Sequence, residues 1–311
     1  CSLFARLAPV EMTEKTSPYI FPFTPFIHLD VAQPTAQFKG PTSWSVSDLA
    51  PLLERFSPKI ELDDGAGSIA DRIVNLFTHP EVLFGKLEFI ESRRDEWLEK
   101  LTVLINSERR IDFTILGYPF KMPVPLKTDR TCADFGELVS LCRLSRIAEA
   151  VSKIYSPGAM VHVFTEGPFG AFNGVDRSVA DAYVASLNHL IEVFELDQGV
   201  TIHDLNTAVD DTPQFDAVWQ EVTEELRAKR DAGDPVVLQA LNDALPVRFH
   251  NLANPGVSSD ELRRAYLDDG SAEDLRRSIH DRAAEGVLFY RGFLDARDRI
   301  KLLEKYVPDG L

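Results

Sequence analysis

The sequence predicts an α/β protein, a Rossmann-like parallel sheet with helical additions at both ends. Two observations lead to this fold class. Short apolar runs alternate with amphipathic helical stretches in the centre of the chain, and mostly helical patterns flank that centre on both sides. Strands and helices that alternate with short connections form right-handed crossovers, which make the strands parallel and cover them with helices.

Three apolar runs are the predicted strands, at residues 111–118, 159–165 and 200–204. Between them lie two stretches, residues 134–155 and 178–196, whose apolar residues recur every three to four positions, as they do in amphipathic helices. We therefore expect the three strands to be parallel neighbours, with both helices packed on the sheet.

Helical patterns continue on either side of this centre. The first 45 residues are irregular, and helices are expected further on, at residues 46–56, 68–77 and 80–106. Later helices are expected at residues 215–232, 235–245, 259–267 and 271–307, the last as one long helix or as a pair broken at Gly286 or Gly292.

The chain is thus expected to have three regions. An N-terminal arm with helices (1–108) precedes an α/β core that carries the site (109–210), and a helical C-terminal region follows (211–311).

Composition excludes several classes of protein. A net charge of −16 and a pI near 4.9 argue against a nucleic-acid-binding protein, which would carry a basic face. No apolar run reaches the length of a membrane-spanning helix. The three cysteines lack metal-ligand spacing, and no metal-binding motif occurs, so we predict a cytoplasmic protein without a metal site.

The loop after the first predicted strand concentrates positive charge. Lys121, Lys127 and Arg130 lie there in a chain that is strongly acidic overall. Ligands of parallel α/β sheets bind outside the carboxyl ends of the strands, where this loop lies. These residues therefore predict a site for a phosphate or a carboxylate, although solvated loop lysines are the alternative.

Two acidic residues at the start of the following helix have two interpretations. Asp134 followed three residues later by Glu137 is the spacing of a capping box, which satisfies free N–H groups at a helix start. The same helix end favours bound anions. Asp134 and Glu137 are therefore predicted to be a cap, a part of the site, or both.

The loop after the second strand, residues 166–177, is rich in glycine and allows close approach of backbone to a ligand. Glu166 opens this loop, and Asp176 near its end either joins the site or caps the next helix. Among the histidines, His203 at the end of the third strand is the better acid/base candidate. His162 is predicted to be a packed histidine, and His250 has no motif around it.

Several of these segments resemble one family. They are Gly117-Tyr118-Pro119-Phe120-Lys121, Ala133-Asp134-Phe135-Gly136-Glu137, Tyr155-Ser156-Pro157-Gly158-Ala159 and Gly174-Val175-Asp176. Together they resemble the pyoverdine/dityrosine biosynthesis family, the isocyanide (isonitrile) synthases. The chain has Thr165-Glu166-Gly167 where the family has a Ser-Asp-Gly-Arg turn, which makes it a divergent member.

The resemblance implies a biosynthetic enzyme of natural-product metabolism that condenses the α-amine of an amino acid with ribulose 5-phosphate. No cofactor is implied, and an iron/2-oxoglutarate oxygenase is expected to act beside it in a pathway. The implied acid/base and charged groups are Lys121, Glu166, Asp134, Glu137 and His203. The implied substrate-binding residues are Tyr118, Phe120, Lys127, Arg130, Phe169, Gly170, Phe172 and Asp176.

Two alternatives stay open. The given sequence stops at Leu311, before the family's Ser-Ile-His-Pro and Thr-Pro-Trp-His segments would occur, so either it is cut short or this branch lacks those histidines. Ser278-Ile279-His280 is no substitute, because it lies inside an amphipathic helix and no proline follows. Loss of the segments favours a non-catalytic small-molecule-binding protein. The altered Glu166-Gly167-Pro168 turn favours a different amino-acid-modifying enzyme on the same scaffold.

Overall fold

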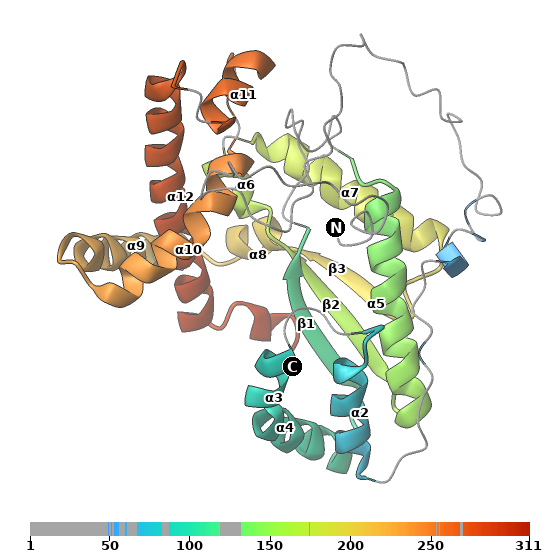
Figure 1. Ribbon diagram of the computed structural model, residues 1–311. Helices are drawn as coiled ribbons and strands as arrows, with labels where there is room; N and C mark the ends of the chain where they lie inside the picture. Colours follow the sequence, from blue (N-terminus) through green and yellow to red (C-terminus); the bar gives the residue numbers. More distant parts are fainter. Residues whose placement is uncertain are drawn as a thin grey trace. The chain divides into compact units, whose positions relative to one another are not determined.

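The computed structural model describes residues 67–82, 87–118, 132–173 and 175–311 except 253, 255, 268 and 269, together with residues 49, 51, 53–55 and 60 (Figure 1). They belong to two compact units, one with residues 44–220 and 293–311, the other with residues 221–292. Within the described residues, no helix is long and apolar enough to cross a membrane.

A three-stranded parallel sheet forms the centre of the first unit. β1 (Ile111–Gly117) pairs with β2 (Ala159–Thr165), and β2 pairs with β3 (Val200–Asp204), so the strand order is β1-β2-β3. The register places Ile111 opposite Ala159 and Val161 opposite Val200. The predicted parallel α/β core is confirmed, and each strand begins at the predicted residue.

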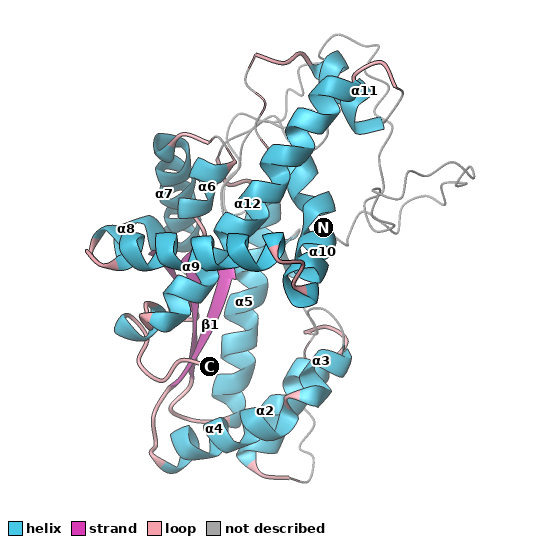
Figure 2. Ribbon diagram, turned by 90° about the vertical axis from the view of Figure 1, so that its left-hand side faces the viewer, coloured by secondary structure: helices cyan, strands magenta, loops and turns pink. Residues whose placement is uncertain are grey.

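The two crossover helices cover the same face of this sheet. α5 (Phe135–Ile154) connects β1 to β2, and α7 (Arg177–Val193) connects β2 to β3. Because the strands lie in chain order, two right-handed crossovers place both helices on one side. Val161 of β2, Leu141 of α5 and Leu187 of α7 belong to one buried cluster. Figure 2 shows α5 running alongside the strands.

The opposite face of the sheet is covered by the last stretch of the chain. Phe164 of β2 is buried in a second cluster with Leu205 of α8 (Leu205–Asp210) and with Leu302 and Val307. These last two residues flank a short 3₁₀ turn, η2 (Leu303–Lys305). Side chains alternate along a strand, so the even-numbered residues of β1 and β2 face this C-terminal stretch.

Leu311 adds to the outer edge of β1. Its N–H donates to the Asp112 carbonyl at 2.9 Å, and its carbonyl accepts from the Thr114 N–H at 2.7 Å. A residue that bonds in this way to both neighbours of Phe113 pairs with β1 in the parallel manner. An ion pair of 2.8 Å between Arg109 and Asp309 holds the same stretch.

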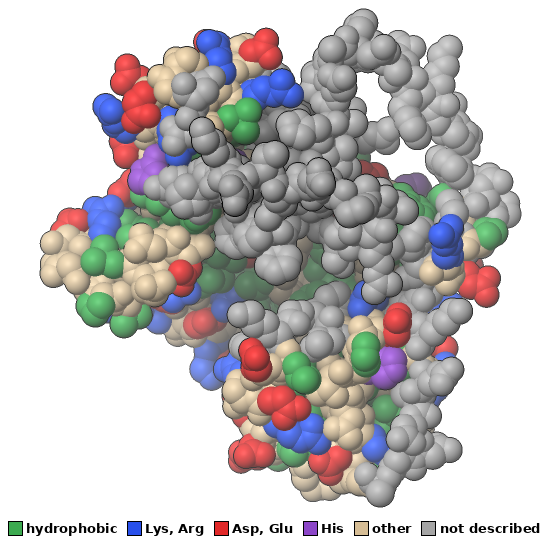
Figure 3. All heavy atoms as spheres, in the orientation of Figure 1, with side chains coloured by type: hydrophobic (Ala, Val, Ile, Leu, Met, Phe, Trp, Pro, Cys, Tyr) green, Lys and Arg blue, Asp and Glu red, His purple; other side chains and the backbone are tan. Residues whose placement is uncertain are grey.

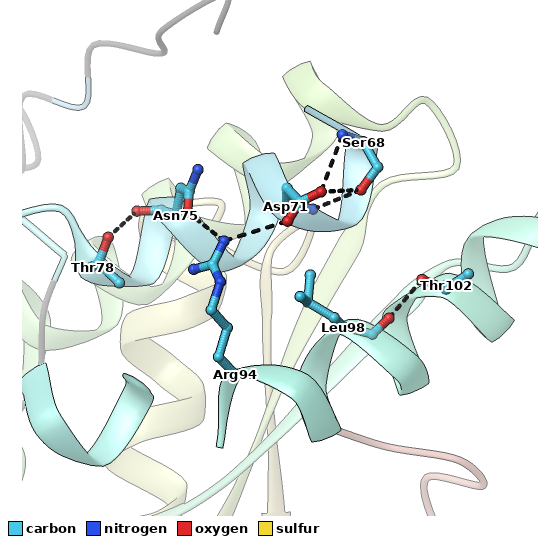
Figure 4. Close-up of polar contacts among 7 residues, drawn as sticks. All are labelled: Ser68, Asp71, Asn75, Thr78, Arg94, Leu98 and Thr102. Atoms are coloured by element: carbon cyan, nitrogen blue, oxygen red, sulfur yellow. Dashed lines mark hydrogen bonds and ion pairs between the residues drawn. The ribbon is translucent and has the colours of Figure 1, made fainter. Parts of the chain in front are cut away.

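Three helices precede the sheet, α2 (Ile69–Thr78), α3 (Leu87–Ser92) and α4 (Arg94–Asn106). The Ser68 hydroxyl caps α2, and Asp71 completes the capping box. Arg94 links α4 to α2, with its guanidinium 2.9 Å from Asn75 Oδ1 and 3.4 Å from Asp71 Oδ1 (Figure 4). In Figure 3, basic and acidic side chains are interspersed over this part of the surface. The described part of residues 80–86, predicted as helix, is a turn.

The second unit is helical. It contains α10 (Pro235–Asn251), α11 (Ser259–Leu267), α9 (Phe215–Asp231) from residue 221 on, and α12 (Glu273–Arg299) as far as residue 292. Glu285 of α12 forms ion pairs with Arg227 and Arg230 of α9.

One sequence prediction for this region was wrong, because α10 was expected to end at Leu245 but continues through Pro246, and the following turns bury Arg248 and Phe249. Of the two alternatives for the last helix, the single long helix is observed: α12 ends at Arg299 and is unbroken at Gly286 and Gly292. A Cβ at Gly292 would lie 2.2 Å from Thr223 Oγ1, so this glycine permits close helix packing and does not interrupt the helix.

Candidate functional site

The cationic loop lies outside the described residues. Phe120, Lys121, Lys127 and Arg130 belong to it, and the side chain of Phe172 is also outside the description. Their predicted roles therefore stay predictions. The structure does describe both ends of the loop, Tyr118 after β1 and Ala133 before α5.

Asp134 and Glu137 form the predicted capping box at the start of α5. Asp134 Oδ1 accepts from the Gly136 N–H at 2.9 Å, and Glu137 Oε2 accepts from the Asp134 N–H at 2.8 Å. Both carboxylates are half-buried. The cap thus engages one oxygen of each carboxylate.

Tyrosine hydroxyls flank Glu137. Tyr183 of α7 donates to Glu137 Oε1 at 3.2 Å, and Tyr118 donates to Ser140 Oγ at 2.6 Å. Burial raises the pKa of Tyr118 to about 12 against the opposing effect of the Ser140 bond, and the charge of Glu137 acts in the same direction as burial. Burial and then the Glu137 charge raise the pKa of Tyr183 well above its usual range. Both hydroxyls are therefore protonated donors at neutral pH.

The backbone at Tyr118 has an unusual conformation. Its φ of 49° lies in the left-handed region, which is uncommon for a residue with a large side chain. This conformation turns the chain directly at the end of β1, where the cationic loop begins.

The loop after β2 packs on the residues that follow β3. It contains a short helix that was not predicted, α6 (Pro168–Phe172), and Glu166 accepts there from the Phe169 N–H through its carbonyl. The Asn206 Nδ2 donor is buried and has no hydrogen-bond partner among the described residues. It lies against Gly167, where an added Cβ would come within 2.4 Å of it.

Replacing Gly167 with alanine is expected to destabilise the protein. The added Cβ would overlap the buried Asn206 amide, and overpacking of this kind costs about 1–3 kcal/mol. Urea unfolding measures the effect. Gly117→Ala is the matched control, because a Cβ there would meet no heavy atom within 4 Å. Equal stability of the two variants would contradict the contact.

The end of the second loop is a helix cap. Asp176 Oδ1 accepts from the Ser178 hydroxyl at 2.5 Å and from the Ser178 N–H at 2.8 Å, and these two bonds lower the pKa of Asp176. The bond from the N–H satisfies the start of α7. Gly170 accepts from the Asn173 and Val175 N–H groups and so closes the turn after α6. Capping was one of the two interpretations of Asp176, and its predicted role in substrate binding stays a prediction.

His203 lies on the face of the sheet opposite α5 and α7. Its Nε2 is 2.9 Å from His162 Nδ1, and His162 Nε2 is 3.0 Å from Asp112 Oδ1. Its ring stacks on Phe164 at 4.6 Å, with Tyr306 of the C-terminal stretch 5.9 Å away. Burial, followed by the nearby His162, lowers the pKa of His203 to about 4.

The hydrogen bonds that link Asp112, His162 and His203 determine the tautomers of the two imidazole rings. The Asp112 carboxylate can only accept, so His162 Nε2 carries the proton and donates to it. His162 Nδ1 is then the acceptor for the Nε2–H of His203. With neutral rings, His203 therefore presents an unprotonated Nδ1.

The described site residues lie in separate parts of the structure. Asp134 and Glu137 are hydrogen-bonded to each other at the start of α5, next to α7, while Glu166, Phe169 and Gly170 follow β2 at the carboxyl edge of the sheet. His203 lies with His162 and Asp112 on the other face. His250 belongs to α10 in the other unit, where its ring contacts Phe249 and Tyr266. The described residues contain no cluster of three or more potential metal ligands.

Sequence reasoning did not single out Tyr183, Asp112 or Asn206. Tyr183 was expected only on the apolar side of its helix, and its hydroxyl reaches Glu137 across 46 residues of sequence. Strand alternation could have placed Asp112 on the same face as His162, because both occupy even positions in paired strands. Asn206 carries no sequence signal.

Comparison with known proteins places this arrangement in a family. Residues 101–252, which contain the whole sheet and both loops, match the family model described as pyoverdine/dityrosine biosynthesis protein. This region of the chain is distantly related to that family.

Relatives in the pyoverdine/dityrosine family are isonitrile synthases of amino acids. The L-tryptophan isonitrile synthase of Fischerella ambigua is 30% identical over 101 residues, 32% of this chain and 31% of that protein. The L-tyrosine isonitrile synthase of Pseudomonas aeruginosa is 28% identical over 117 residues, 37% of this chain and 36% of that protein. The matches thus span about a third of each relative.

The fold agrees with a solved structure of the same family. The crystal structure of the PvcA protein from Pseudomonas aeruginosa superposes with a TM-score of 0.57 over 78% of this chain and 77% of that one, at 17% sequence identity. The similarity in fold therefore extends well beyond the stretch that can be aligned by sequence.

Proposed function

We propose that the chain is a biosynthetic enzyme that modifies the α-amine of an amino acid, as an isonitrile synthase does, by condensing it with ribulose 5-phosphate. The observation that carries this proposal is the position of the family match. It spans β1 to β3 and both loops at the carboxyl edge, where parallel sheets bind their ligands.

The proposed reaction needs three kinds of group. Lys121, Lys127 and Arg130 would bind the phosphate of the sugar, since concentrated cations are the usual partners of a phosphate. Glu166, Asp134 and Glu137 would supply proton transfer and a counter-charge for the amine. His203 is a further acid/base candidate, although its Nε2 is engaged with His162.

Aromatic residues near both loops would line the side-chain pocket. Tyr118 lies at the start of the first loop and Phe169 lies in α6 of the second, and Phe120 and Phe172 occur in the same segments. Gly170 and Asp176 complete the proposed substrate-binding set. The relatives act on tryptophan and tyrosine, so an aromatic amino acid is the first substrate to test.

In the proposed reaction the amine attacks the C2 ketone of ribulose 5-phosphate, and loss of water gives an imine. Proton transfers and fragmentation then leave the former C2 carbon as the isonitrile carbon. An isonitrile product would be a suitable substrate for an iron/2-oxoglutarate oxygenase in the same pathway.

Isotope labelling tests this proposal. Purified protein is incubated with ribulose 5-phosphate carrying ¹³C at C2 and with each amino acid in turn, and products are analysed by mass spectrometry. We expect a product in which the label is retained in an isonitrile. Protein with Glu137→Gln and Lys121→Ala together is the control. Absence of any labelled product with all amino acids would contradict the use of ribulose 5-phosphate.

A specific observation favours a second candidate, an amino-acid-modifying enzyme with another co-substrate. The turn after β2 reads Thr165-Glu166-Gly167 and lacks the arginine that the family has there. Binding of an amino acid without turnover of ribulose 5-phosphate would support this candidate.

A further inference from the structure

The second unit contains a cavity of about 160 Å³ between α10 and α12. The two helices pack against each other beside it, because Phe249 of α10 is buried in one cluster with Ile279 and Ala283 of α12 (Figure 2). The described residues that line the cavity belong to these two helices. The cavity is therefore separate in sequence from the sheet and from the loops of the candidate site.

α10 supplies the apolar wall of this cavity. Leu245, Pro246 and Phe249 line it, and Phe249 is only 5% exposed, so its ring is held in the core. Leu245 packs against the same buried cluster. An apolar cavity of about 150 Å³ accommodates benzene. The α10 wall therefore has room for one ring or for a branched aliphatic group of similar size.

α12 supplies the charged wall, which is open to solvent. Arg277 and His280 line the cavity, and so does Glu273 one turn before Arg277. Arg277 Nη2 is 3.4 Å from Glu273 Oε1, with the side chains 64% and 55% exposed. The nearby acids Asp274 and Asp281 do not line the cavity and are largely exposed. Exposed ion pairs contribute little, because water and salt screen them, so the Arg277 guanidinium can exchange its partner for the carboxylate of a ligand.

Arg276 is a fixed part of the same wall. Its guanidinium lies 5.5 Å from the centroid of the Phe249 ring, and Nη1 donates to the Ala265 carbonyl of α11 at 3.0 Å. It adds positive charge beside the apolar wall without having to bind the ligand itself. Among the described lining residues, two arginines thus stand against one acid, Glu273, in a chain with net charge −16. This local excess of positive charge favours an anion.

We propose that this cavity binds a small monocarboxylate that carries a single ring or a branched aliphatic group. The apolar part of the ligand would lie against Leu245, Pro246 and Phe249, and its carboxylate would pair with Arg277 in place of Glu273. A guanidinium matches a carboxylate in both geometry and charge. The inference does not rest on the proposed function, because the cavity lies in the unit that contains neither the sheet nor its loops.

Calorimetric titration with phenylacetate tests this site, because the probe has one ring, one carboxylate and no amine. We expect the wild-type protein to bind it with a Kd of about 1 mM or lower, as for a ligand of its size. Acetate lacks the ring, and 2-phenylethylamine has an ammonium group in place of the carboxylate. Both should bind at least about 10-fold more weakly, because one loses the apolar contact and the other is repelled by the arginines.

Two substitutions on α12 should act in opposite directions. Arg277→Gln should weaken binding of phenylacetate about 3–5-fold, as for an exposed ion pair, and Glu273→Gln should strengthen it about 2–5-fold because the competing carboxylate is removed. Arg263→Gln makes the same change of charge at an exposed position on α11 outside the cavity, and it should match wild type. All three side chains are exposed, so each variant is expected to fold.

The results separate a specific site from general attraction of an anion. Equal effects of Arg277→Gln and Arg263→Gln, or binding of 2-phenylethylamine as tight as that of phenylacetate, would overturn the inference. Failure of the wild-type protein to bind phenylacetate would overturn it as well. These outcomes leave the proposed enzyme activity untouched, since that activity is tested with amino acids and ribulose 5-phosphate.

Discussion

Lys121→Ala is expected to weaken binding of a phosphorylated or carboxylate-bearing substrate by about 2–5 kcal/mol, the cost of losing one partner of a charge pair that is buried on binding. The reason lies in the sequence. Lys121 falls in a cationic loop of a chain with net charge −16, so the local charge opposes the long-range field of the protein. Calorimetry with ribulose 5-phosphate measures the loss.

Lys121→Arg separates two roles of this lysine. Arginine can replace lysine as a partner of an anion, but it cannot form an imine with a ketone. Substantial rescue by arginine therefore indicates charge pairing, and little rescue indicates a covalent role. Lys100→Ala is the control, since Lys100 is an exposed lysine that pairs with Glu96 on α4. Wild-type turnover by Lys121→Ala would remove this residue from the mechanism and favour a binding protein.

The fold could be predicted because its determinants are local. The strands at 111–117, 159–165 and 200–204 are short apolar runs, and the helices between them show regular apolar spacing, so each element carries its own signal. The rules for crossovers then determine the parallel order. The sequence left open whether α12 is broken at its glycines, because the role of Gly292 depends on Thr223, which is distant in sequence.

In the candidate site, too, local features could be predicted from the sequence and contacts between distant residues could not. The capping box of Asp134 and Glu137 depends on a spacing of three residues, and the sequence predicts it directly. The contact of Glu137 with Tyr183 depends on how α5 and α7 pack against each other, which no local pattern specifies. The same holds for His203, whose bond to His162 requires the side-chain geometry of two neighbouring strands.

The hydrogen-bonded side chains of Asp112, His162 and His203 lead to the second prediction. We expect the folded protein to lose stability as the pH falls, because His203 must then take up a proton. The pKa of His203 falls from 6.5 to about 4 in the folded protein, so the native state binds fewer protons than the unfolded state between these values. Stability from this group is complete above about pH 6.5 and is lost as the pH falls toward 4.

We expect His203 to account for about 1–2 kcal/mol of the decrease in unfolding free energy between pH 7 and pH 4, less than the full shift implies because the ring is only partly buried and solvent screens it. Urea unfolding at several pH values measures this. His203→Gln should have a shallower pH dependence than wild type, whereas His189→Gln, at an exposed position on α7, should match wild type. Carboxylates titrate in the same window in all three proteins, so the difference between variants isolates the histidine. An unchanged slope in His203→Gln would show that His203 does not control the acid response and that the C-terminal stretch over Phe164 is held independently of it.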